Sequence, residues 1–504
     1  MKKRAAALFI EMLILMQVFV TTALCEDKGI EIDEAHFPDV VFRTYIAANF
    51  DSDNNGNLSE EEINAITLLY VDGKGISSLK GIEYFNSLRL LHCYSNVLTS
   101  LDVSNNRLLE TLFCGDNNIT SLNLTNNPRL QNLSCGGLNL SQLDLGKNTA
   151  LTDLSCDNCG LSNLDISKNA ALKYLSCQSN NLTSLDVSKN EALSYLNCSS
   201  NNLASLNVDN NHLLATLKCA SNSLTNLNVS NLLSLAYLEC QFNSLSSLDV
   251  SNCPALKELN CNNNHLTKLN ISNDQMIYYL NCSDNNLSSL DVSNNQKLTD
   301  LFCINNGLSS LNLSNNKSLK LLSCSGNNLT SLDISSNTAL SALYCVNNHL
   351  VCLNLTNNTA LQPYAVNCHS NTRAIKAANG KIDLSMLSGF DITKASNWQG
   401  ATLDGMTLTV NESGNVTYVY NCGNDINATF TLNVTVEKID FVAGDITNDG
   451  TVNIMDVIRL LKYVSGWGVE VNQAACDVTG DGAINIMDVI RLLKYVSGWN
   501  VTIQ

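Results

Sequence analysis

The fold is decided by Leu88-Arg89-Leu90-Leu91-His92-Cys93-Tyr94-Ser95-Asn96-Val97-Leu98, whose frame Leu-x-x-Leu-x-Cys-x-x-Asn-x-Leu returns every 21 residues. Its cysteine recurs without insertion at positions 93, 114, 135, 156, 177, 198, 219, 240, 261, 282, 303, 324 and 345. Leu91 and Cys93 alternate with a period of two, which predicts a short strand whose two side chains point inward. A single strand of this kind cannot close a core, so stacked copies must bury the leucines. The pattern therefore predicts a parallel sheet of roughly 60 Å at ~4.8 Å per strand.

A fixed period within about 20 to 29 residues, combined with this leucine frame, resembles the leucine-rich repeat, a one-dimensional solenoid. We assign residues 70–371 to it. A second half-repeat, such as Leu185-Asp186-Val187, also alternates, and we expect short strands on the back of the solenoid. Asparagines such as Asn96 should turn the chain after each strand, because a side-chain amide satisfies backbone groups left unpaired by the bend. Leu138 and Cys159 interrupt that column, and valine replaces cysteine in both terminal repeats, at Val71 and Val366.

The cysteine column has two interpretations. Buried cysteines can pack as small apolar side chains, or they can form a disulfide framework if the chain is secreted. Twenty cysteines in 504 residues is well below the density of disulfide scaffolds. Neighbours in register on parallel strands also have poor disulfide geometry. We therefore expect reduced, buried thiols.

The first 25 residues have the features of a signal peptide. Lys2-Lys3-Arg4 is basic, residues 5–20 are mostly apolar, and Thr21-Thr22-Ala23 is a plausible cleavage site. Glu11 interrupts the apolar run, and no other stretch is long and apolar enough to span a membrane. The chain contains 46 acidic residues against 29 Lys and Arg, which argues against nucleic acid as a partner. We expect a secreted, extracellular protein.

Residues 26–69 contain a candidate calcium loop. The stretch from Asp51 to Glu62 matches D-x-[DN]-x-[DN]-G-x5-E without a gap, so it resembles an EF-hand. Oxygen ligands at positions 1, 3, 5, 7 and 12 can surround Ca²⁺, and these positions are Asp51, Asp53, Asn55, Asn57 and Glu62. A helix with Phe37, Val41, Tyr45 and Ile46 on one face should precede the loop, and a helix within 59–69 should follow it. We expect a structural cap.

A column of residues just before each inward leucine should border the concave face, where solenoids usually bind. Four tyrosines fall in this column, and we name them the ligand face: Tyr174, Tyr195, Tyr237 and Tyr279. Exposed aromatic side chains among polar ones suit the stacking of sugars or a protein hot spot. The alternative is that tyrosine is simply frequent in strands. The ligand, protein or glycan, is not identified by the sequence.

The pattern changes near residue 380, and residues 372–438 form a separate segment. Stretches 407–410, 416–420 and 428–436 alternate like strands of a small antiparallel β module. No catalytic constellation is visible in it, and we expect a cap or spacer.

Two similar twelve-residue loops, each opening a helix, occupy the C-terminal segment 439–504. They begin at Asp445 and Asp477, and residues 453–467 are repeated identically as 485–499. The duplication, within repeats 445–467 and 477–499, resembles a type I dockerin, an all-α module that binds calcium and docks into cohesin modules of cellulosome scaffoldins. This resemblance implies Ca²⁺ ligands at Asp445, Thr447, Asp449, Thr451 and Asp456, and at Asp477, Thr479, Asp481, Ala483 and Asp488. Threonine occupies position 3 of both loops, where the family usually has Asn or Asp.

The same resemblance implies which residues contact a cohesin. These are Ile454, Met455, Leu461 and Lys462 in the first repeat, and Ile486, Met487, Leu493 and Lys494 in the second. Because the two helices are identical, a cohesin should accept the module in either of two orientations.

Every segment of the chain is thereby assigned to a module, and none is left for a typical catalytic domain of about 100 to 200 residues. We expect a mainly β leucine-rich-repeat solenoid with a small helical calcium-binding cap, a small β module and an all-α dockerin. The function expected is non-catalytic: docking to a cohesin of a cellulosome-type polysaccharide-degrading complex and display of the solenoid to a ligand. The alternative is an enzyme, or an enzyme inhibitor, with its site on the solenoid or the β module.

Overall fold

The computed structural model describes residues 29–437 and 441–504. The expected signal peptide, residues 1–25, lies outside the described residues. The chain divides into two compact units, which are described separately: one extends to Arg373 and includes Val419–Phe430, and the other comprises Ala374–Tyr418 and Thr431–Gln504.

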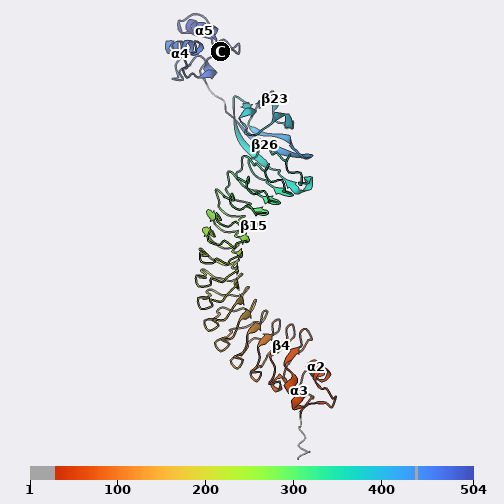
Figure 1. Ribbon diagram of the computed structural model, residues 1–504. Helices are drawn as coiled ribbons and strands as arrows, with labels where there is room; N and C mark the ends of the chain where they lie inside the picture. The colour runs from red at the N-terminus through yellow and green to blue at the C-terminus, as the bar shows by residue number, and fades with distance from the viewer. Residues whose placement is uncertain (1–28, 438–440) are drawn as a thin grey trace, which may run out of the picture. The chain divides into compact units, whose positions relative to one another are not determined.

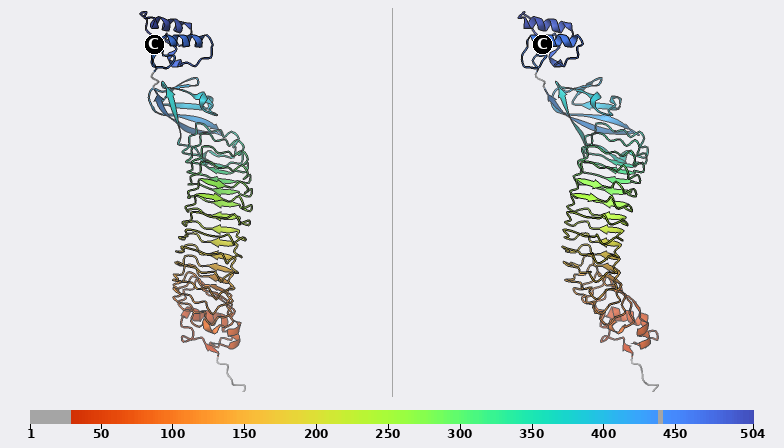
Figure 2. Two further views of the ribbon diagram at one scale, coloured as in Figure 1. Left: turned by 90° about the vertical axis from the view of Figure 1, so that its left-hand side faces the viewer. Right: turned by 60° about the vertical axis from the view of Figure 1, so that its left-hand side comes forward.

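A 15-stranded parallel sheet dominates the first unit and confirms the leucine-rich-repeat solenoid. Its strands lie side by side almost in sequence order (Figures 1 and 2). They are β3 (Leu68–Tyr70), β4 (Leu90–His92), β5 (Thr111–Phe113), β6 (Asn132–Ser134), β7 (Asp153–Ser155), β8 (Tyr174–Ser176), β9 (Tyr195–Asn197), β10 (Thr216–Lys218), β11 (Tyr237–Glu239), β13 (Glu258–Asn260), β15 (Tyr279–Asn281), β16 (Asp300–Phe302), β17 (Leu321–Ser323), β18 (Ala342–Tyr344) and β19 (Val366–Asn367).

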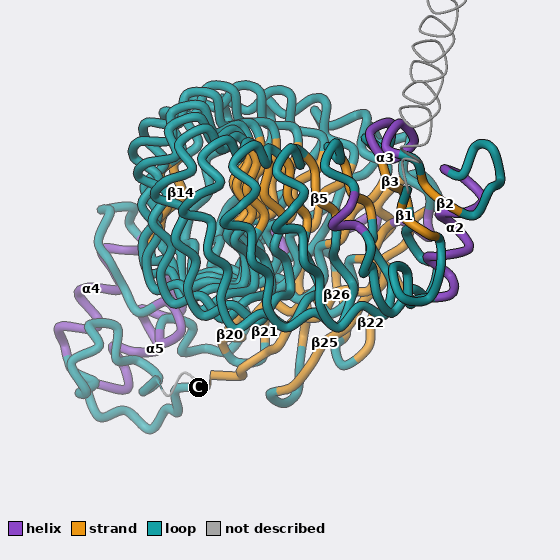
Figure 3. Tube along the Cα trace, turned by 90° about the horizontal axis from the view of Figure 1, so that it is seen from below, coloured by secondary structure: helices purple, strands orange, loops and turns teal. Residues whose placement is uncertain are grey.

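The short strands follow from the alternation of inward and outward side chains. The pairing is in register, as in Leu91 opposite Leu112, so each central leucine stacks on its copy. Leu91 and Cys93 are fully buried, whereas the first and third residues of most strands remain partly exposed. The sheet lies on the concave side of the solenoid (Figure 1), and most of the remainder of each turn is loop (Figure 3). The outward residues of the strands therefore form a concave surface.

The expected asparagine column satisfies the turns after the strands. The Asn117 Nδ2 donates hydrogen bonds to the carbonyls of Cys93 and Cys114, both at 2.9 Å, and its Oδ1 accepts one from Leu98 N at 3.0 Å. At the interruption, the Cys159 thiol donates to the Cys135 carbonyl at 3.1 Å. A thiol thus partly replaces the amide in one of the two irregular turns.

A second column of buried asparagines was not anticipated from the sequence. The Asn127 Nδ2 donates to the carbonyls of Val103 and Asn106, both at 3.0 Å. The column comprises Asn106, Asn127, Asn148, Asn169, Asn190, Asn211, Asn295, Asn316, Asn337 and Asn358, all 0% exposed. Leu232, Cys253 and Asp274 interrupt it, at the same spacing of 21 residues. Each amide ties two successive turns together, so this column is a structural ladder.

The expectation of strands across the back of the solenoid was largely wrong. Within the described part of the chain, the paired strands there are β12 (Ser247–Asp249) and β14 (Lys268–Asn270), the latter labelled in Figure 3. In most turns, those of β12 and β14 included, the Asp or Asn after the leucine accepts a hydrogen bond from the backbone two residues later, as from Ser188 N to Asp186 Oδ1 at 2.9 Å. Such local bonds compete with a strand ladder and favour a turn.

The assignment of Val366 to the cysteine column was also wrong. Val366 pairs with Leu343 in β19, so it occupies the leucine column. Cys345 N donates to the Asn367 carbonyl, and the buried Cys368 follows in the cysteine column. The last repeat is therefore two residues longer than the others, because 23 rather than 21 positions separate Cys345 from Cys368. At the other end Val71 does take the cysteine position, with its N–H bonded to His92 O.

The N-terminal cap contains helices α2 (Val40–Phe50) and α3 (Glu60–Ala65) and the antiparallel pair β1 (Ile30–Glu31) and β2 (Asn57–Leu58). Phe37, Phe42 and Ile46 are fully buried, but Val41 is 39% exposed, so the inward face of α2 is carried by Phe42 instead. Helix α3 stops at Ala65 and does not continue to residue 69, because Leu69 is buried in the first strand of the sheet.

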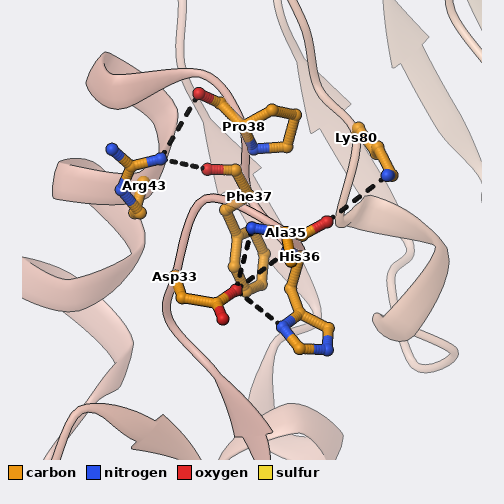
Figure 4. A network of polar contacts seen from close by, with 7 residues as sticks. All are labelled: Asp33, Ala35, His36, Phe37, Pro38, Arg43 and Lys80. Carbon is orange, nitrogen blue, oxygen red and sulfur yellow. Dashed lines mark hydrogen bonds and ion pairs between the residues drawn. The ribbon is translucent and has the colours of Figure 1, made fainter.

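A polar network orders the segment before α2 (Figure 4). The Asp33 Oδ1 accepts hydrogen bonds from Ala35 N, His36 N and His36 Nδ1, the last at 2.7 Å. The Arg43 guanidinium donates to the Phe37 carbonyl at 2.6 Å, and the Lys80 ammonium reaches the Ala35 carbonyl at 3.3 Å. These contacts join the cap to the first turn of the solenoid.

The β module contains a seven-stranded sheet with strand order β22-β25-β26-β20-β21-β24-β23, which confirms the strands expected near 407, 416 and 428. The strands are β20 (Asn371–Ala378), β21 (Lys381–Asp383), β22 (Ala395–Gln399), β23 (Thr402–Asp404), β24 (Thr407–Thr409), β25 (Gly414–Gly423) and β26 (Ile426–Glu437). Five short 3₁₀ turns lie among the described residues: η1 (Ile82–Tyr84), η2 (Pro363–Ala365), η3 (Leu384–Met386), η4 (Ile392–Lys394) and η5 (Gln473–Ala475).

The C-terminal segment forms two helices of identical sequence, α4 (Ile454–Val464) and α5 (Ile486–Val496). Both begin with a capping box, Asn453 with Asp456 and Asn485 with Asp488, which satisfies the first N–H groups of each helix. The core between them is made of Ile446, Val457, Leu460, Ala475, Cys476, Val478, Val489 and Leu492.

Candidate functional sites

The first C-terminal loop is closed on itself by its carboxylates. Asp445 is 3% exposed, and its two oxygens accept hydrogen bonds from Asp449 N and Gly450 N at 3.1 and 2.8 Å. Asp456 is fully buried; its Oδ1 accepts from Thr447 N and Oγ1, and its Oδ2 accepts from Asn453 N, all at 2.8 Å. Positions 3 and 12 are therefore brought together at the start of α4, and position 1 closes the loop through positions 5 and 6.

The second loop repeats this arrangement. The Asp488 Oδ1 accepts hydrogen bonds from Thr479 N at 3.0 Å and Thr479 Oγ1 at 2.8 Å. The Asp477 Oδ2 accepts from Gly482 N at 2.8 Å. Burial acts to raise the pKa of Asp477, but the backbone donors of Gly482 and Gly480 outweigh burial and lower that pKa. The carboxylate and hydroxyl oxygens of this loop form the kind of donor set that Ca²⁺ prefers.

The two C-terminal helices expose equivalent apolar faces. Ile454, Met455 and Leu461 are 49%, 57% and 43% exposed, and their counterparts Ile486, Met487 and Leu493 are 49%, 55% and 43% exposed. Lys462 and Lys494 are also exposed. Because the values agree within two percentage points, the module presents one patch twice.

The N-terminal loop brings three carboxylates close together. Oxygens of Asp51, Asp53 and Glu62 all lie within 4.8 Å of one another. The Glu62 Oε1 accepts hydrogen bonds from Ser52 N and Ser52 Oγ, both at 2.6 Å, and the Ser52 hydroxyl is the main cause that lowers the pKa of Glu62 to about 2. The Asn55 Oδ1 accepts from Asn57 N at 2.7 Å. Gly56, with φ of 82°, makes the turn that the loop requires.

The four tyrosines of the ligand face lie along one column of the concave sheet but not in one continuous stack. Tyr174 and Tyr195 are stacked, with centroids 4.4 Å apart and planes at 9°. In the strand register, Thr216 lies between Tyr195 and Tyr237, and Glu258 lies between Tyr237 and Tyr279. Tyr237 lies below the Lys257 ammonium at 6.0 Å, and Tyr279 packs against Phe302 at 5.6 Å.

Comparison with known proteins identifies the C-terminal module. Residues 443–497 match the family described as "Dockerin type I domain". This segment is a type I dockerin. A dockerin implies a cohesin as partner, and type I dockerin domains bind calcium.

The solenoid is similar to internalins. A stretch of 70 residues is 36% identical to Internalin J of Listeria monocytogenes, covering 14% of this chain and 8% of that protein. The solved structure "Functional domain of InlJ from Listeria monocytogenes includes a cysteine ladder" matches with a TM-score of 0.66 and 28% identity, over 81% of this chain and 99% of that one. An internalin, InlF of the same species, matches with a TM-score of 0.55 and 25% identity, over 67% and 98% of the two chains. The fold is thus an internalin-like leucine-rich repeat solenoid.

Two features of the dockerin were missed in the sequence analysis. Ile458 and Ile490, 40% and 39% exposed, extend each patch; their spacing of four residues from Ile454 and Ile486 was the available signal. Trp467 and Trp499 are 70% and 64% exposed after the helices, with the Lys462 and Lys494 ammonium groups 5.8 Å from their rings.

In the internalin-like solenoid, an aromatic cluster near the cap was missed. Tyr70 packs on His92 at 5.0 Å, and His92 on Phe113 at 4.4 Å. The three residues occupy the third strand position, which is two residues beyond the column that contains the tyrosines.

Proposed function

We propose that this chain is a secreted, non-catalytic binding protein of a cellulosome-type polysaccharide-degrading complex. Its dockerin docks onto a cohesin of a scaffoldin, and its leucine-rich repeats present the concave face to a protein or glycan. The observation that carries this proposal is the pair of equally exposed apolar patches on α4 and α5, because an apolar surface repeated on identical helices has no packing reason. The divisions 26–69, 70–371, 372–438 and 439–504 act as cap, solenoid, β module and dockerin.

Calcium is the cofactor of the proposed dockerin interaction. Asp445, Thr447, Asp449, Thr451 and Asp456 would hold one ion, and Asp477, Thr479, Asp481, Ala483 and Asp488 a second, with Ala483 contributing only its backbone carbonyl. The bound ion supplies positive charge that holds both ends of a loop, so it orders the helix that carries the patch.

A third calcium ion at Asp51, Asp53, Asn55, Asn57 and Glu62 would serve the cap. The convergence of three carboxylates within 4.8 Å supports this site, since like charges this close repel one another unless a cation lies among them. Its role is structural, because the loop leads directly into α3 and the first strand of the solenoid.

Within residues 29–437 and 441–504, no helix combines the length and apolar character needed to cross a bilayer. Secretion itself rests on the basic and apolar start of the sequence.

The docking proposal is tested by calorimetry of the full chain against purified cohesin modules, with calcium and with a chelator. Calcium-dependent binding is expected. Binding unchanged by the chelator, or absent from every cohesin of the same organism, would contradict the proposal.

Assays of the full chain on cellulose, xylan, pectin and protein substrates test the non-catalytic role. Measurable turnover would instead support the alternative of an enzyme, and inhibition of the partner enzymes of the complex would support an inhibitor.

A further inference from the structure

A hollow of about 250 Å³ lies on the concave sheet between β5 and β8. Strands β6 and β7 form its floor, with Leu133 and Leu154 buried beneath it. The outward residues that line it are Phe113, Asn132, Ser134, Asp153, Ser155 and Tyr174.

A pair of packed aromatic rings lies on each of two opposite sides of this hollow. Phe113 packs against His92 on the side toward the cap, and Tyr174 packs against Tyr195 on the far side. The register places β6 and β7 between these strands, and neither carries an aromatic outward residue. The Tyr174 ring, stacked on Tyr195, therefore has its other face free toward the hollow, and Phe113 borders the hollow from three strand steps away, roughly 14 Å.

The hollow is open because small residues occupy the positions where a side chain would fill it. Ser134 and Ser155 take the third strand position, which Phe113 occupies in β5. Gly115 follows β5, and a Cβ there would meet the Gly136 carbonyl oxygen at 2.5 Å. The two backbone segments approach each other so closely that position 115 requires glycine.

The charge in and around the hollow is negative. Asp153 is its one charged lining residue, and no lysine or arginine is among the eight residues that line it. Asp157 lies at the edge, where its Oδ2 accepts a hydrogen bond from Ser155 Oγ at 3.2 Å and its Oδ1 accepts from Ser176 Oγ at 2.6 Å. The chain as a whole has a formal net charge of −17, so a cationic ligand is favoured at long range as well.

We propose that this hollow is a subsite for the guanidinium group of an arginine side chain on a partner protein. A guanidinium is planar, weakly hydrated and always charged, so it stacks on an aromatic face while its N–H groups bind a carboxylate. The Tyr174 ring offers the face, and Asp153 offers the carboxylate. A neutral sugar would also stack on the rings and donate hydroxyl hydrogen bonds to Asp153, but it would gain no ion pair with that carboxylate. The inference deepens the proposed function, since it rests on the concave face as the binding surface.

The experiment is calorimetry of the full chain with acetyl-arginine amide, acetyl-citrulline amide and cellobiose. Citrulline replaces the guanidinium by a neutral group of nearly the same shape, so it should bind about tenfold more weakly or worse. Asp153→Asn should weaken binding of the arginine compound about tenfold, and Tyr174→Ala should weaken it as well. Ser155→Phe should fill the hollow and abolish binding.

Asp300→Asn is the matched control. Asp300 occupies the same column as Asp153 and accepts the same 2.6 Å hydrogen bond from a preceding threonine, Thr299 in place of Thr152. In its strand the third position carries Phe302, which packs against Tyr279, whereas the strand of Asp153 has the small Ser155 at that position. Binding should not change in this variant, and thermal unfolding should be the same for all variants.

Equal binding of the arginine and citrulline compounds, or unchanged binding by Asp153→Asn, would overturn the inference. Absence of any arginine binding would overturn it too. Binding of cellobiose that is lost in Tyr174→Ala, with no binding of arginine, would reject the arginine subsite yet leave the concave face as a ligand surface. Failure of cohesin binding would concern the proposed docking alone.

Discussion

Asp274 places a carboxyl group at a position where most repeats of the second column have an asparagine amide. It stands in the second ladder, where each asparagine donates two hydrogen bonds to carbonyls 24 and 21 positions earlier. For Asp274 those carbonyls belong to Val250 and Cys253. Its carboxyl group is buried, and neither oxygen has a hydrogen-bond partner. Burial, followed by the charge of Asp249, raises its pKa to about 7, because a low-dielectric site and a like charge both disfavour the ionised form.

Stability of the solenoid should therefore fall as the pH rises from about 4 to 7. In this window the unfolded chain releases the Asp274 proton at its ordinary pKa of 3.8 while the folded chain retains it, so the unfolded state is favoured progressively. The accumulated loss is roughly 2–4 kcal/mol. Asp274→Asn supplies an amide donor and should abolish this dependence and stabilise the protein at pH 8. Denaturant unfolding at pH 5 and pH 8 measures it, with Asn295→Asp as a control that should add a second dependence. Parallel pH profiles of wild type and Asp274→Asn would contradict the assignment.

The thiols of the cysteine column should be unreactive in the native state. Cys114 is fully buried, and burial raises its pKa to about 12, so the reactive thiolate is scarce at pH 8. Labelling with a thiol reagent should be slow for the native chain and complete in denaturant, as followed by mass spectrometry. Rapid native labelling along the column would mean that the solenoid opens readily.

At the scale of elements, the decisive feature is that α4 and α5 are identical in sequence and capping and expose equivalent apolar patches. Each patch of the dockerin can contribute about 1.5–3 kcal/mol per buried apolar side chain. Two equivalent patches allow two orientations of one cohesin.

Changing Ile454 and Met455 to Asp should block one orientation and lower cohesin affinity about twofold, since one of two equivalent modes remains. The matched change of Ile486 and Met487 should do the same, and the combined variant should abolish binding. Calorimetry of the three variants measures this. If either single pair already destroys binding, the faces are not equivalent.

At the scale of the whole molecule, the proposed calcium sites and the solenoid core rest on different interactions. The dockerin loops are built from carboxylates, and metal binding to such loops is coupled to their folding. The solenoid core is made of leucine, cysteine and asparagine columns, which need no ion.

A chelator should therefore unfold α4 and α5 and abolish cohesin binding while the parallel sheet persists. Far-ultraviolet circular dichroism should show loss of helix with retained β signal, and a separate high-temperature transition should remain. Glu62→Gln serves as the control that weakens only the proposed site in the cap. Loss of the β signal on chelation would show that calcium also supports the solenoid.

The sequence by itself determined the main features that depend on a local, repeated pattern. The strands around Leu91 and its copies, the burial of the cysteine column and the two loop–helix repeats of the dockerin were all predictable. The reason is that side-chain alternation and ligand spacing act within a dozen residues, and repetition removes the ambiguity of any one instance.

Only the tertiary structure decided the features that depend on which residues become neighbours. Pairing of Val366 with Leu343 shifted the last repeat by two residues and placed Cys368 in the cysteine column. Most of the expected back strands are replaced by turns in which a backbone N–H donates to the Asp or Asn side chain two residues earlier. The hollow between Phe113 and Tyr174 exists because the two intervening strands place the small residues Ser134 and Ser155 beside them. The asparagine ladder that Asp274 interrupts likewise depends on contacts between successive turns. These contacts arise when the turns stack, and no single repeat encodes them.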